Sequence, residues 1–526
     1  MRAKGDKINN NKIVRGNLMK ILRLVFSKWL ISVLLLLAQV AAIVLVAIYL
    51  LEYLIWFQVI SVAIGVIVFF VCVNRKENPE YKIPWLFLIL FLPLFGVLFY
   101  LMFSRVNTSR KMRKIYAKAY DELLPYVNNI DKDIEKAYEY MGDRQGIDRY
   151  LKENSGLGPQ QNNEVKYYPV GELMWKDMLE ALESAKKFIL MEYFIVDPGH
   201  MWDSIHEILV RKAKEGVRVH LVYDDLGTMT MLKSGYYKKL RKEGIDAHKF
   251  NPFTPIVSAV YNNRSHRKIM VVDGLIGFTG GINLGDEYIN ENDRLGHWKD
   301  TGLRMRGNAV NSLTALFFTD FIIAKREIPE FEFYFNKNPE KFNTPGTICP
   351  FGDGPRPLYY EQIGEENFVN IVGQAKKYFY ISTPYLIIDH HFTQALKNAA
   401  MRGVDVRVVT PHIPDKKIVF CLTRSSYKEL RKAGVKVYEY TPGFIHAKML
   451  VSDDDMAFVG TINMDFRSLT HHFECGAVLY KNDCIRDIYN DFQHIFEVSQ
   501  EIDDKFKLSF GAKVAKVLLE TFRTLF

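Results

Sequence analysis

The segments HRKIMVVDGLIGFTGGIN (266–283) and HAKMLVSDDDMAFVGTIN (446–463) carry one pattern twice, 180 residues apart. Each begins with His-x-Lys, reaches an Asp five positions after the Lys, and continues to a Gly and an Asn at fixed distances. The residues in these positions are His266, Lys268, Asp273, Gly280 and Asn283, then His446, Lys448, Asp453, Gly460 and Asn463. A single His-x-Lys is common on ordinary surface strands. Repetition of the whole pattern at identical spacing indicates an internal duplication.

Other segments repeat in the same order. LVRKAKEGVRVHLVYDD (209–225) parallels LKNAAMRGVDVRVVTPH (396–412), and residues 237–244 parallel residues 427–434. In each half, helical periodicity ends at a Gly and is followed by a β-branched strand. We therefore predict an α/β fold of two repeats related by a pseudo-twofold axis, each with helices packed on a largely parallel sheet.

The predicted domain boundaries follow from these patterns and from composition. Residues 1–118 form a basic leader with transmembrane helices, and residues 119–165 form a polar helical connector. The first repeat is predicted to span residues 166–345 and the second residues 346–526.

The doubled motif predicts phosphate chemistry. Residues i and i+2 of a strand face the same side, so each His points with its Lys into a shared space. Two repeats would bring two imidazoles and two ammonium groups around one cavity. The ammonium groups can stabilise a pentacoordinate transition state, while one His attacks phosphorus and the other donates a proton to the leaving alcohol.

Two further carboxylates are candidate supports for these histidines. Asp300 follows His266 by 34 positions and Glu474 follows His446 by 28 positions, each beside an apolar strand. A carboxylate on the far nitrogen of an imidazole would set its tautomer. The alternative for both residues is an ordinary surface acid.

No metal or other cofactor is predicted. The five cysteines form no Cys-x-x-Cys pair, and the histidines lack the spacing of a helical metal site. The paired lysines would supply the positive charge that a metal ion provides elsewhere.

The positive charge of the chain is concentrated near its N-terminus. Of the formal net charge of +9, residues 1–28 carry +7, residues 29–103 carry 0 and residues 104–118 carry +6, which leaves −4 for residues 119–526. Basic groups that flank apolar segments suit anionic lipids, whereas a nucleic-acid channel would need a basic stripe in the catalytic part.

Three apolar runs follow the leader, at about residues 29–51, 54–73 and 84–103. Each exceeds the roughly 18 residues expected of a spanning helix, so we predict three transmembrane helices. A signal peptide for the first run and a buried hairpin for all three are the alternatives. Three full crossings would put the two basic segments on opposite sides, against the positive-inside rule. The third run contains Pro84, Pro93 and Gly96, so a kinked or re-entrant segment is an alternative there.

Apolar residues also recur at helical spacing between Lys505 and Phe526, with basic residues between them. This pattern predicts an amphipathic C-terminal helix, which would lie either in the membrane interface or against the protein's own core.

The motifs resemble those of the phospholipase D superfamily, whose signature is a doubled His-x-Lys-x4-Asp, and within it the bacterial cardiolipin synthases. The resemblance extends from about Leu54 onward. It includes MEYFIVD (191–197), HWKDTGLRMRG (297–307), STPYLIID (382–389) and TINMDFRSLTHHFE (461–474). Two features depart from the family. The apolar run at residues 29–51 is additional, and Gly281 and Thr461 stand where many members carry Ser.

The resemblance implies an enzyme that moves a phosphatidyl group between two phosphatidylglycerol molecules through a phosphohistidine, giving cardiolipin and glycerol. It implies that His266 is the nucleophile and His446 the general acid/base, and that Asn283 and Asn463 contact the substrate phosphate. The alternatives are a hydrolytic membrane phospholipase D, a membrane-tethered nuclease and a non-enzymatic scaffold. The expected location is the bacterial cell membrane with several crossings and the active site at the membrane surface, on the cytoplasmic side. The expected partners are phosphatidylglycerol and other anionic lipids, without nucleic acid, and the sequence leaves oligomeric state open.

Overall fold

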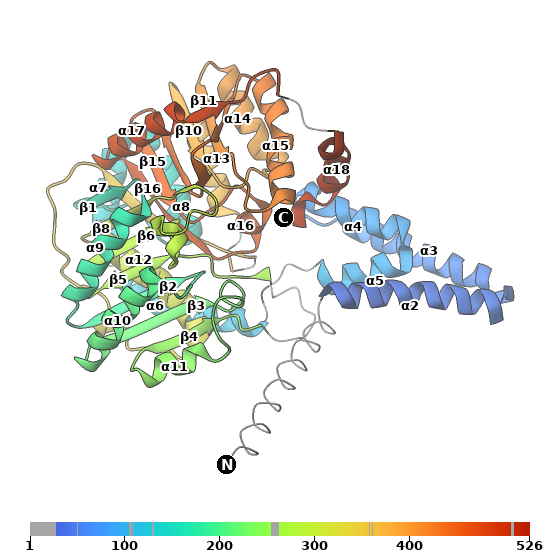
Figure 1. Ribbon diagram of the computed structural model, residues 1–526, viewed down its shortest axis with the longest axis horizontal. Coiled ribbons are helices and arrows are strands. Elements are labelled where there is room, and N and C mark those ends of the chain that lie inside the picture. Colours follow the sequence, from blue (N-terminus) through green and yellow to red (C-terminus); the bar gives the residue numbers. More distant parts are fainter. Residues whose placement is uncertain are drawn as a thin grey trace, which may run out of the picture. The chain divides into compact units, whose positions relative to one another are not determined.

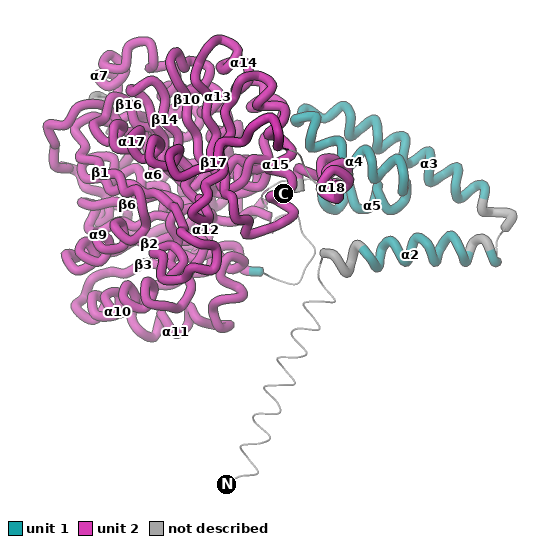
Figure 2. The backbone as a smooth tube through the Cα atoms, turned by 45° about the horizontal axis from the view of Figure 1, so that its top comes forward, with its two compact units in different colours: residues 1–107, 253–261 teal, residues 108–252, 262–526 magenta. Residues whose placement is uncertain are grey.

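The computed structural model describes residues 28–49, 51–104, 108, 110–128, 131–253, 262–356, 358–359, 361–506 and 510–525. The basic leader, residues 1–27, lies outside the described residues. Contacts divide the chain into two compact units (Figure 2). We call residues 1–107 with 253–261 the N-terminal unit, and residues 108–252 with 262–526 the catalytic unit.

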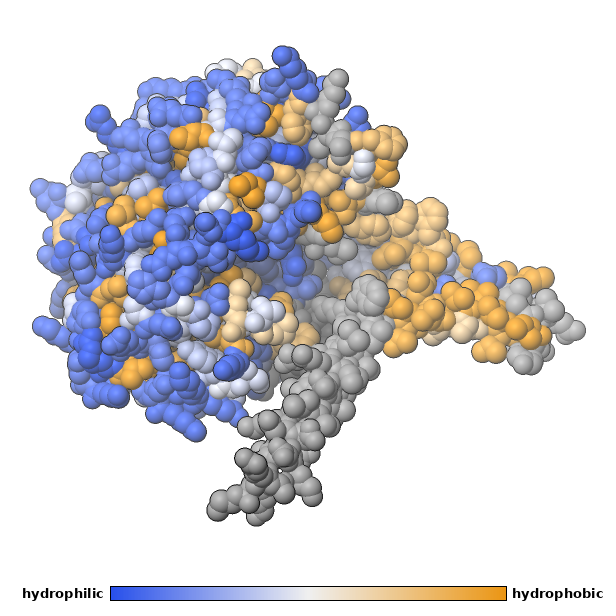
Figure 3. Space-filling model, viewed as in Figure 1, coloured by the Kyte–Doolittle hydropathy of each residue, from blue (hydrophilic) through white to orange (hydrophobic). Residues whose placement is uncertain are grey.

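The N-terminal unit is helical. Its helices are α2 (Lys28–Tyr49), α3 (Leu51–Val73), α4 (Pro79–Phe91) and α5 (Pro93–Phe103). Apolar side chains cover the surface of these helices (Figure 3). Within the described residues, Ile55–Val73 is long and apolar enough to cross a membrane, while the apolar stretch Val33–Leu45 of α2 is shorter.

The third apolar run does not form the single spanning helix predicted at residues 84–103. Helix α4 ends at Phe91, and Leu92 has the non-helical angles φ −134° and ψ 69°. Pro93 then begins α5, because a proline ring is compatible with the first turn of a helix and not with its interior.

Helices α4 and α5 fold back on each other as a helical hairpin. The rings of Trp85 and Tyr100, on either side of the break, lie 5.8 Å apart. Gly96 permits the sharp reversal, since a Cβ there would lie 2.3 Å from the carbonyl oxygen of Leu88. Pro93, at the tip, packs against Gly65 of α3. Gly65 lies eight residues before the end of α3, so the tip reaches about 12 Å along that helix.

The catalytic unit contains two sheets of matching topology (Figure 1). The first has the order β1-β8-β6-β5-β2-β3-β4 and the second the order β17-β12-β11-β10-β14-β15-β16-β9. The strands of the first are β1 (Glu164–Tyr168), β2 (Phe188–Tyr193), β3 (Arg218–Asp224), β4 (Asp246–Phe250), β5 (Ile269–Val272), β6 (Ile276–Gly280) and β8 (Gly302–Arg306). Those of the second are β9 (Thr347–Asp353), β10 (Tyr378–Ser382), β11 (Asp405–Pro411), β12 (Lys436–Tyr440), β14 (Met449–Ser452), β15 (Met456–Gly460), β16 (Glu474–Tyr480) and β17 (Ser499–Glu501). The predicted duplication is therefore visible strand by strand.

The sheets are mixed, whereas a largely parallel sheet was expected. Only β2-β3-β4 and β10-β11-β12 run parallel, and the strand after each His-x-Lys pairs antiparallel with both of its neighbours. The reason is the short connection from β5 to β6 and from β14 to β15. Connections this short join antiparallel strands, whereas parallel strands need a long crossover.

The two sheets share a buried core around α12 (Ala309–Lys325). Residues 309–323 of this helix are all buried. Along β2, Phe188 and Leu190 face this shared core, while Ile189 and Met191 face a second cluster under α9 and α10, as the two-residue period of a strand requires. The helices of the first repeat are α9 (Gly171–Ser184), α10 (His200–Lys214) and α11 (Tyr236–Lys242). Those of the second are α13 (Ile363–Gln374), α14 (His390–Met401), α15 (Lys417–Lys432), α16 (Phe466–Thr470), α17 (Cys484–Glu497) and α18 (Phe510–Thr521).

The predicted connector is helical and belongs to the catalytic unit. It comprises α6 (Arg110–Asn128), α7 (Asp131–Met141) and α8 (Gln145–Ser155). Helix α6 begins at Arg110, inside the region that the sequence assigned to the membrane part. Arg144 ties the connector to the second repeat through a 2.9 Å ion pair with Asp453.

The C-terminal helix α18 uses two faces. One face packs on α15, where Ser425 Oγ donates to Glu520 at 2.8 Å. The other leaves Phe510, Val514 and Val517 exposed by 83%, 52% and 70%. The helix thus covers part of its own domain and also presents an unpartnered apolar stripe.

Candidate active site

Each His-x-Lys lies at the entry to a central strand and is held there by the other repeat. The His266 backbone N–H donates to the Phe473 carbonyl at 2.8 Å, and the His446 N–H donates to the Lys299 carbonyl at 2.7 Å. Strand β7 (His297–Lys299) also pairs with β13 (Gly443–Ile445), which leads into His446. These bonds bring the two motifs to the boundary between the repeats.

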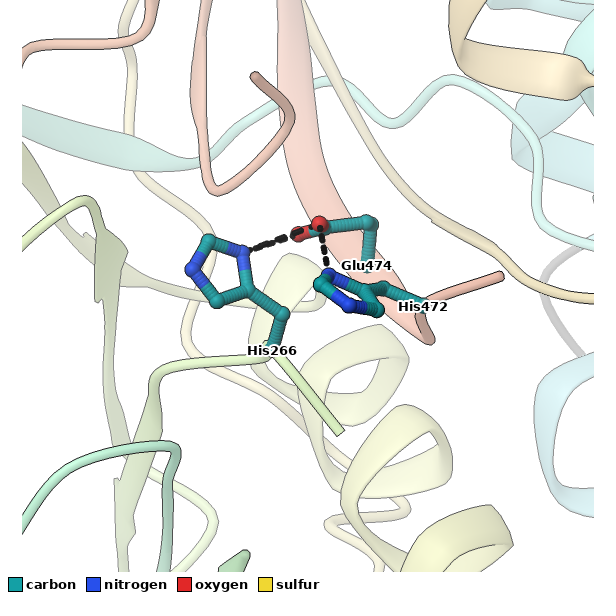
Figure 4. Close-up of side chains that lie close together, drawn as sticks. All are labelled: His266, His472 and Glu474. Atoms are coloured by element: carbon teal, nitrogen blue, oxygen red, sulfur yellow. Dashed lines mark hydrogen bonds and ion pairs between the residues drawn. The ribbon is translucent and has the colours of Figure 1, made fainter. Parts of the chain in front are cut away.

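The carboxylates that support the histidines are exchanged between the repeats. His266 Nδ1 lies 2.9 Å from both oxygens of Glu474 (Figure 4), and His446 Nδ1 lies 2.6 Å from Asp300. The sequence had paired each carboxylate with the His upstream of it in the same repeat. The structure instead places each carboxylate against Nδ1 of the histidine from the opposite repeat. Because Nδ1 faces a carboxylate, Nε2 is the ring nitrogen left for chemistry.

The two carboxylates are held by different means. Glu474 accepts hydrogen bonds from Thr461 Oγ1 and, at 2.5 Å, from Ser468 Oγ. Asp300 accepts from the N–H of Thr301 at 2.9 Å. A Cβ at Gly281 would lie 2.0 Å from Asp300 Oδ1, so a serine there would displace the carboxylate. This explains the glycine at position 281, while at the matching position the hydroxyl of Thr461 is bound to Glu474.

The two lysines lie beside the histidines in full burial. Lys268 Nζ donates to the carbonyl of His266 at 2.6 Å, and Lys448 Nζ donates to the carbonyl of His446. Burial lowers the pKa of Lys268 to about 8. Burial, helped by repulsion from Lys268, lowers the pKa of Lys448 to about 7. Both ammonium groups are therefore poised to gain stability from an incoming anion.

The imidazoles are neutral before substrate binds. Burial, together with repulsion from the lysines, lowers the pKa of His266 and of His446 to about 4 in spite of their carboxylates. Burial alone would raise the pKa of Glu474 and of Asp300, but the neighbouring histidines and, at Asp300, Lys448 outweigh it and lower both. Two carboxylates thus offset two ammonium groups, and a phosphodiester would bring one uncompensated negative charge.

The structure does not bring Asp273 and Asp453 to the histidines, although both were predicted to be catalytic. The carboxylate of Asp273 accepts the N–H groups of residues 186–188 at 2.7–2.8 Å, and Asp453 accepts those of residues 376–378 at 2.7–3.0 Å. Each Asp ends the strand that its Lys begins. Five residues of extended chain separate them by about 16 Å. Their role is to anchor the start of β2 and β10, the strands next to the motif.

The two asparagines differ from each other. Asn283 is buried, with its amide oxygen bound to the N–H of Ile195 at 3.0 Å and its nitrogen bound to the Tyr288 hydroxyl at 2.7 Å. These bonds fix the orientation of the side chain, but an amide nitrogen has a second N–H, so the phosphate contact stays a prediction. Asn463 is also buried, but its amide oxygen has no partner within the described residues. The two asparagines of the repeated motif therefore have different surroundings.

Sequence reasoning missed His472. Its ring centroid lies 5.6 Å from that of His266, and its Nδ1 lies 3.7 Å from Glu474 (Figure 4). The signal was the His pair just before Glu474. His266, His472 and Glu474 offer ligand atoms within 4.8 Å of one another. The repulsion from Lys268 that lowers the pKa of His266 also opposes a divalent cation there.

Aromatic rings surround His446 in place of a second histidine. The rings of Trp298 and Tyr288 lie 5.3 Å and 5.6 Å from it. The two halves of the site therefore have the same reacting groups in unlike environments.

Comparison with known proteins identifies the family. The family model described as "Cardiolipin synthase, PLD-like domain" matches residues 178–299 and 368–496, one segment in each repeat. The cardiolipin synthase of Alkalihalophilus pseudofirmus is 34% identical over 85% of this chain and 88% of its own, and cardiolipin synthase 2 of Bacillus cereus is 36% identical over 85% and 86%. The chain belongs to the cardiolipin synthase family.

Other matches concern the N-terminal region and the fold. A model described as "Phospholipase_D-nuclease N-terminal" matches residues 63–105, which in this member of the cardiolipin synthase family include the α4–α5 hairpin. The crystal structure of phosphatidylserine synthase from Haemophilus influenzae covers 73% of this chain and 98% of its own with a TM-score of 0.55 and 14% identity. That likeness establishes the fold of the two repeats.

Replacing Asp300 by Asn should lower kcat for phosphatidyl transfer by about 10²- to 10⁴-fold, because His446 loses the carboxylate that orients it and stabilises its protonated form. Removal of this buried charge should also lower the temperature of unfolding, so activity is measured below the transition of the variant. Asp293→Asn, an exposed acid seven residues upstream, is the matched control. Equal activity of the two variants would show that the crossed pair is not part of the machinery.

The fall of kcat/KM at alkaline pH should follow the loss of the proton from Lys448. This lysine is cationic below its pKa and neutral above it, so kcat/KM in neutral micelles should fall as the pH rises through about 7. Lys448→Arg keeps the positive charge at alkaline pH, so the fall of kcat/KM should move to higher pH. An active Lys448→Arg enzyme whose kcat/KM falls at the same pH as that of wild type would contradict this assignment.

Proposed function

We propose that this chain condenses two phosphatidylglycerol molecules into cardiolipin and releases glycerol through a phosphohistidine. The observation that supports this most is the pair of exchanged His–carboxylate bonds. They leave two Nε2 atoms and two ammonium groups in one buried site, the set of groups needed for two successive displacements at phosphorus.

In the first half-reaction, His266 Nε2 attacks the phosphorus of the donor lipid. The bond from phosphorus to the glycerol oxygen breaks, and protonated His446 gives its Nε2 proton to that oxygen. Glycerol leaves, and the phosphatidyl group remains on His266. Lys268 and Lys448 stabilise the charge on the equatorial oxygens.

The second half-reaction reverses these roles with a new alcohol. The terminal hydroxyl of the second phosphatidylglycerol attacks the same phosphorus, its proton passes to His446, and the bond from phosphorus to His266 breaks. Cardiolipin is released with His446 protonated again. Assignment of His266 as nucleophile and His446 as acid/base rests on resemblance to the family.

Charge balance explains how His446 becomes an acid at neutral pH. Its pKa of about 4 belongs to the site without substrate. A phosphodiester anion beside both imidazoles raises their pKa, because a nearby opposite charge favours the protonated form. Substrate binding therefore recruits the proton that the leaving group needs.

Purified protein given labelled phosphatidylglycerol should produce cardiolipin and glycerol in equal amounts, measured by mass spectrometry. Rapid denaturation in SDS at mildly alkaline pH, where the phosphorus–nitrogen bond is stable, should trap a phosphatidyl group on His266. The label should be absent from His266→Asn. Phosphatidic acid as the main product would instead support a hydrolase. A label on His446 would reverse the two roles, and no turnover would favour a scaffold.

We also propose that the chain crosses the membrane twice and re-enters it once. Helices α2 and α3 would cross in opposite directions, and the α4–α5 hairpin would reach only as far as Gly65 before returning. The basic segments 1–28 and 104–118 would then lie on the same side. The positive-inside rule makes that side cytoplasmic, and the catalytic unit continues from there. The re-entrant alternative thus removes the conflict that three full crossings create.

Introduced cysteines test this topology. In a chain without its native cysteines, a membrane-impermeant thiol reagent added to intact cells should label Glu52→Cys. It should leave Gly5→Cys, Lys76→Cys and Lys118→Cys unlabelled until the membrane is permeabilised. Labelling of Lys118→Cys, at an exposed position of the second basic segment, in intact cells would establish a third crossing.

A further inference from the structure

We propose that a cavity beside the second motif binds the phosphate of the acceptor lipid. This inference rests on the proposed function, since it assigns a place to the second of two lipid substrates. The cavity has a volume of about 520 Å³. It lies between the first turn of α15, the segment after β10 and the short helix α16.

The polar lining of the cavity suits an anion. Lys416, Lys417 and Arg467 face it, against the single carboxylate of Asp465. Asp465 is engaged at the start of α16, where it accepts the Ser468 N–H at 2.8 Å. Lys416 forms an ion pair with Asp415 and donates a hydrogen bond to the Tyr385 hydroxyl. Among the described residues, Lys417 and Arg467 form no salt bridge, so two cations remain for a ligand.

The remaining lining suits an acyl chain. Ile387, Ile418 and Val419 also line the cavity, and Ile418 is 54% exposed. Ile418 lies one turn before Cys421, whose Sγ contacts the carbonyl of Ala512 in α18. The exposed Phe510 lies just before Ala512, and the contact between Ser425 and Glu520 shows that both helices run in the same direction. The apolar stripe of α18 therefore starts at the cavity end of α15, which favours a lipid over a free anion.

The cavity also adjoins the reacting groups. Its residues Asp465 and Arg467 follow Asn463 by two and four positions. The Ile387 N–H donates to the carbonyl of Met464 at 2.8 Å, which joins the other wall to the same segment. Tyr385 packs against the hydrophobic core cluster of the first repeat, which includes Tyr288 and Trp298, the rings next to His446. A lipid phosphate held here would present its headgroup hydroxyl on the His446 side, where the acceptor must lose its proton.

The first repeat lacks these cations, so they are not a requirement of the duplicated fold. The repeat offset of 190 residues between Tyr237 and Tyr427 places Gly227 opposite Lys417. Counted from the motif asparagine, Glu287 takes the place of Arg467. A feature present in only one repeat fits a reaction in which two lipids play different roles.

The test compares a reaction that needs both the donor and the acceptor lipid with a reaction that needs the donor lipid alone. Cardiolipin formation needs both lipids, whereas exchange of labelled glycerol into phosphatidylglycerol needs only the donor, because free glycerol resolves the phosphohistidine. The double variant Lys417→Gln/Arg467→Gln should lose cardiolipin formation by about tenfold or more, as expected for lost hydrogen bonds to a charged group. Glycerol exchange should persist at a rate near that of wild type. Lys428→Gln, an exposed lysine on the same helix, should retain both activities.

Three results would overturn the proposal. Parallel loss of both activities would place the donor in the cavity or show a damaged fold, which thermal unfolding distinguishes. Retention of cardiolipin formation would exclude a lipid role. Binding of inorganic phosphate to wild type that is lost in the double variant, with cardiolipin formation retained in both, would make the cavity a free-anion site. A wild-type protein that catalyses neither reaction would instead refute the proposed function itself.

Discussion

The exchanged His–carboxylate bonds are the constraint on which the rest of the structure depends. His266 is oriented by Glu474 and His446 by Asp300, so neither repeat contains a complete acid/base group by itself. The backbone bonds from each His to the residue before the opposite carboxylate hold this exchange in register. The shared core around α12 then serves to keep two similar domains in one relative position.

Burial gives these bonds their chemical effect. In a site closed to water, each ammonium and each carboxylate is stable only because the others are present. This balance keeps both imidazoles neutral at rest and makes the site responsive to one added negative charge. The same reacting groups nevertheless face different surroundings. His266 lies beside His472, while His446 lies beside aromatic rings and a cationic cavity, so a symmetric fold supports an asymmetric reaction.

Much of this arrangement was predictable because duplication leaves a record in residue spacing. The doubled motif, the succession of strands and helices along each repeat and the pairing of His with Lys follow from local periodicity. The exchange of Asp300 and Glu474 does not, because it depends on how the repeats pack. Spacing also placed Asp273 in the motif without revealing that its carboxylate faces backbone N–H groups at the far end of the strand. Composition identified the apolar run at 84–103, but the reversal at Leu92 arises from one proline and one close helix contact.

The exchange of partners also has a consequence for synthesis of the chain. Asp300 emerges from the ribosome 146 residues before His446, the imidazole that binds it. At the usual 5–20 residues per second, the first repeat waits roughly 7–30 s for that partner. Throughout this interval His266 and Asp300 lack the partners that the second repeat supplies, so the first domain cannot close its charged face when its own sheet is complete. Docking of the second repeat is therefore the step that excludes water from the site. Until then, this face of the nascent first repeat is exposed to solvent.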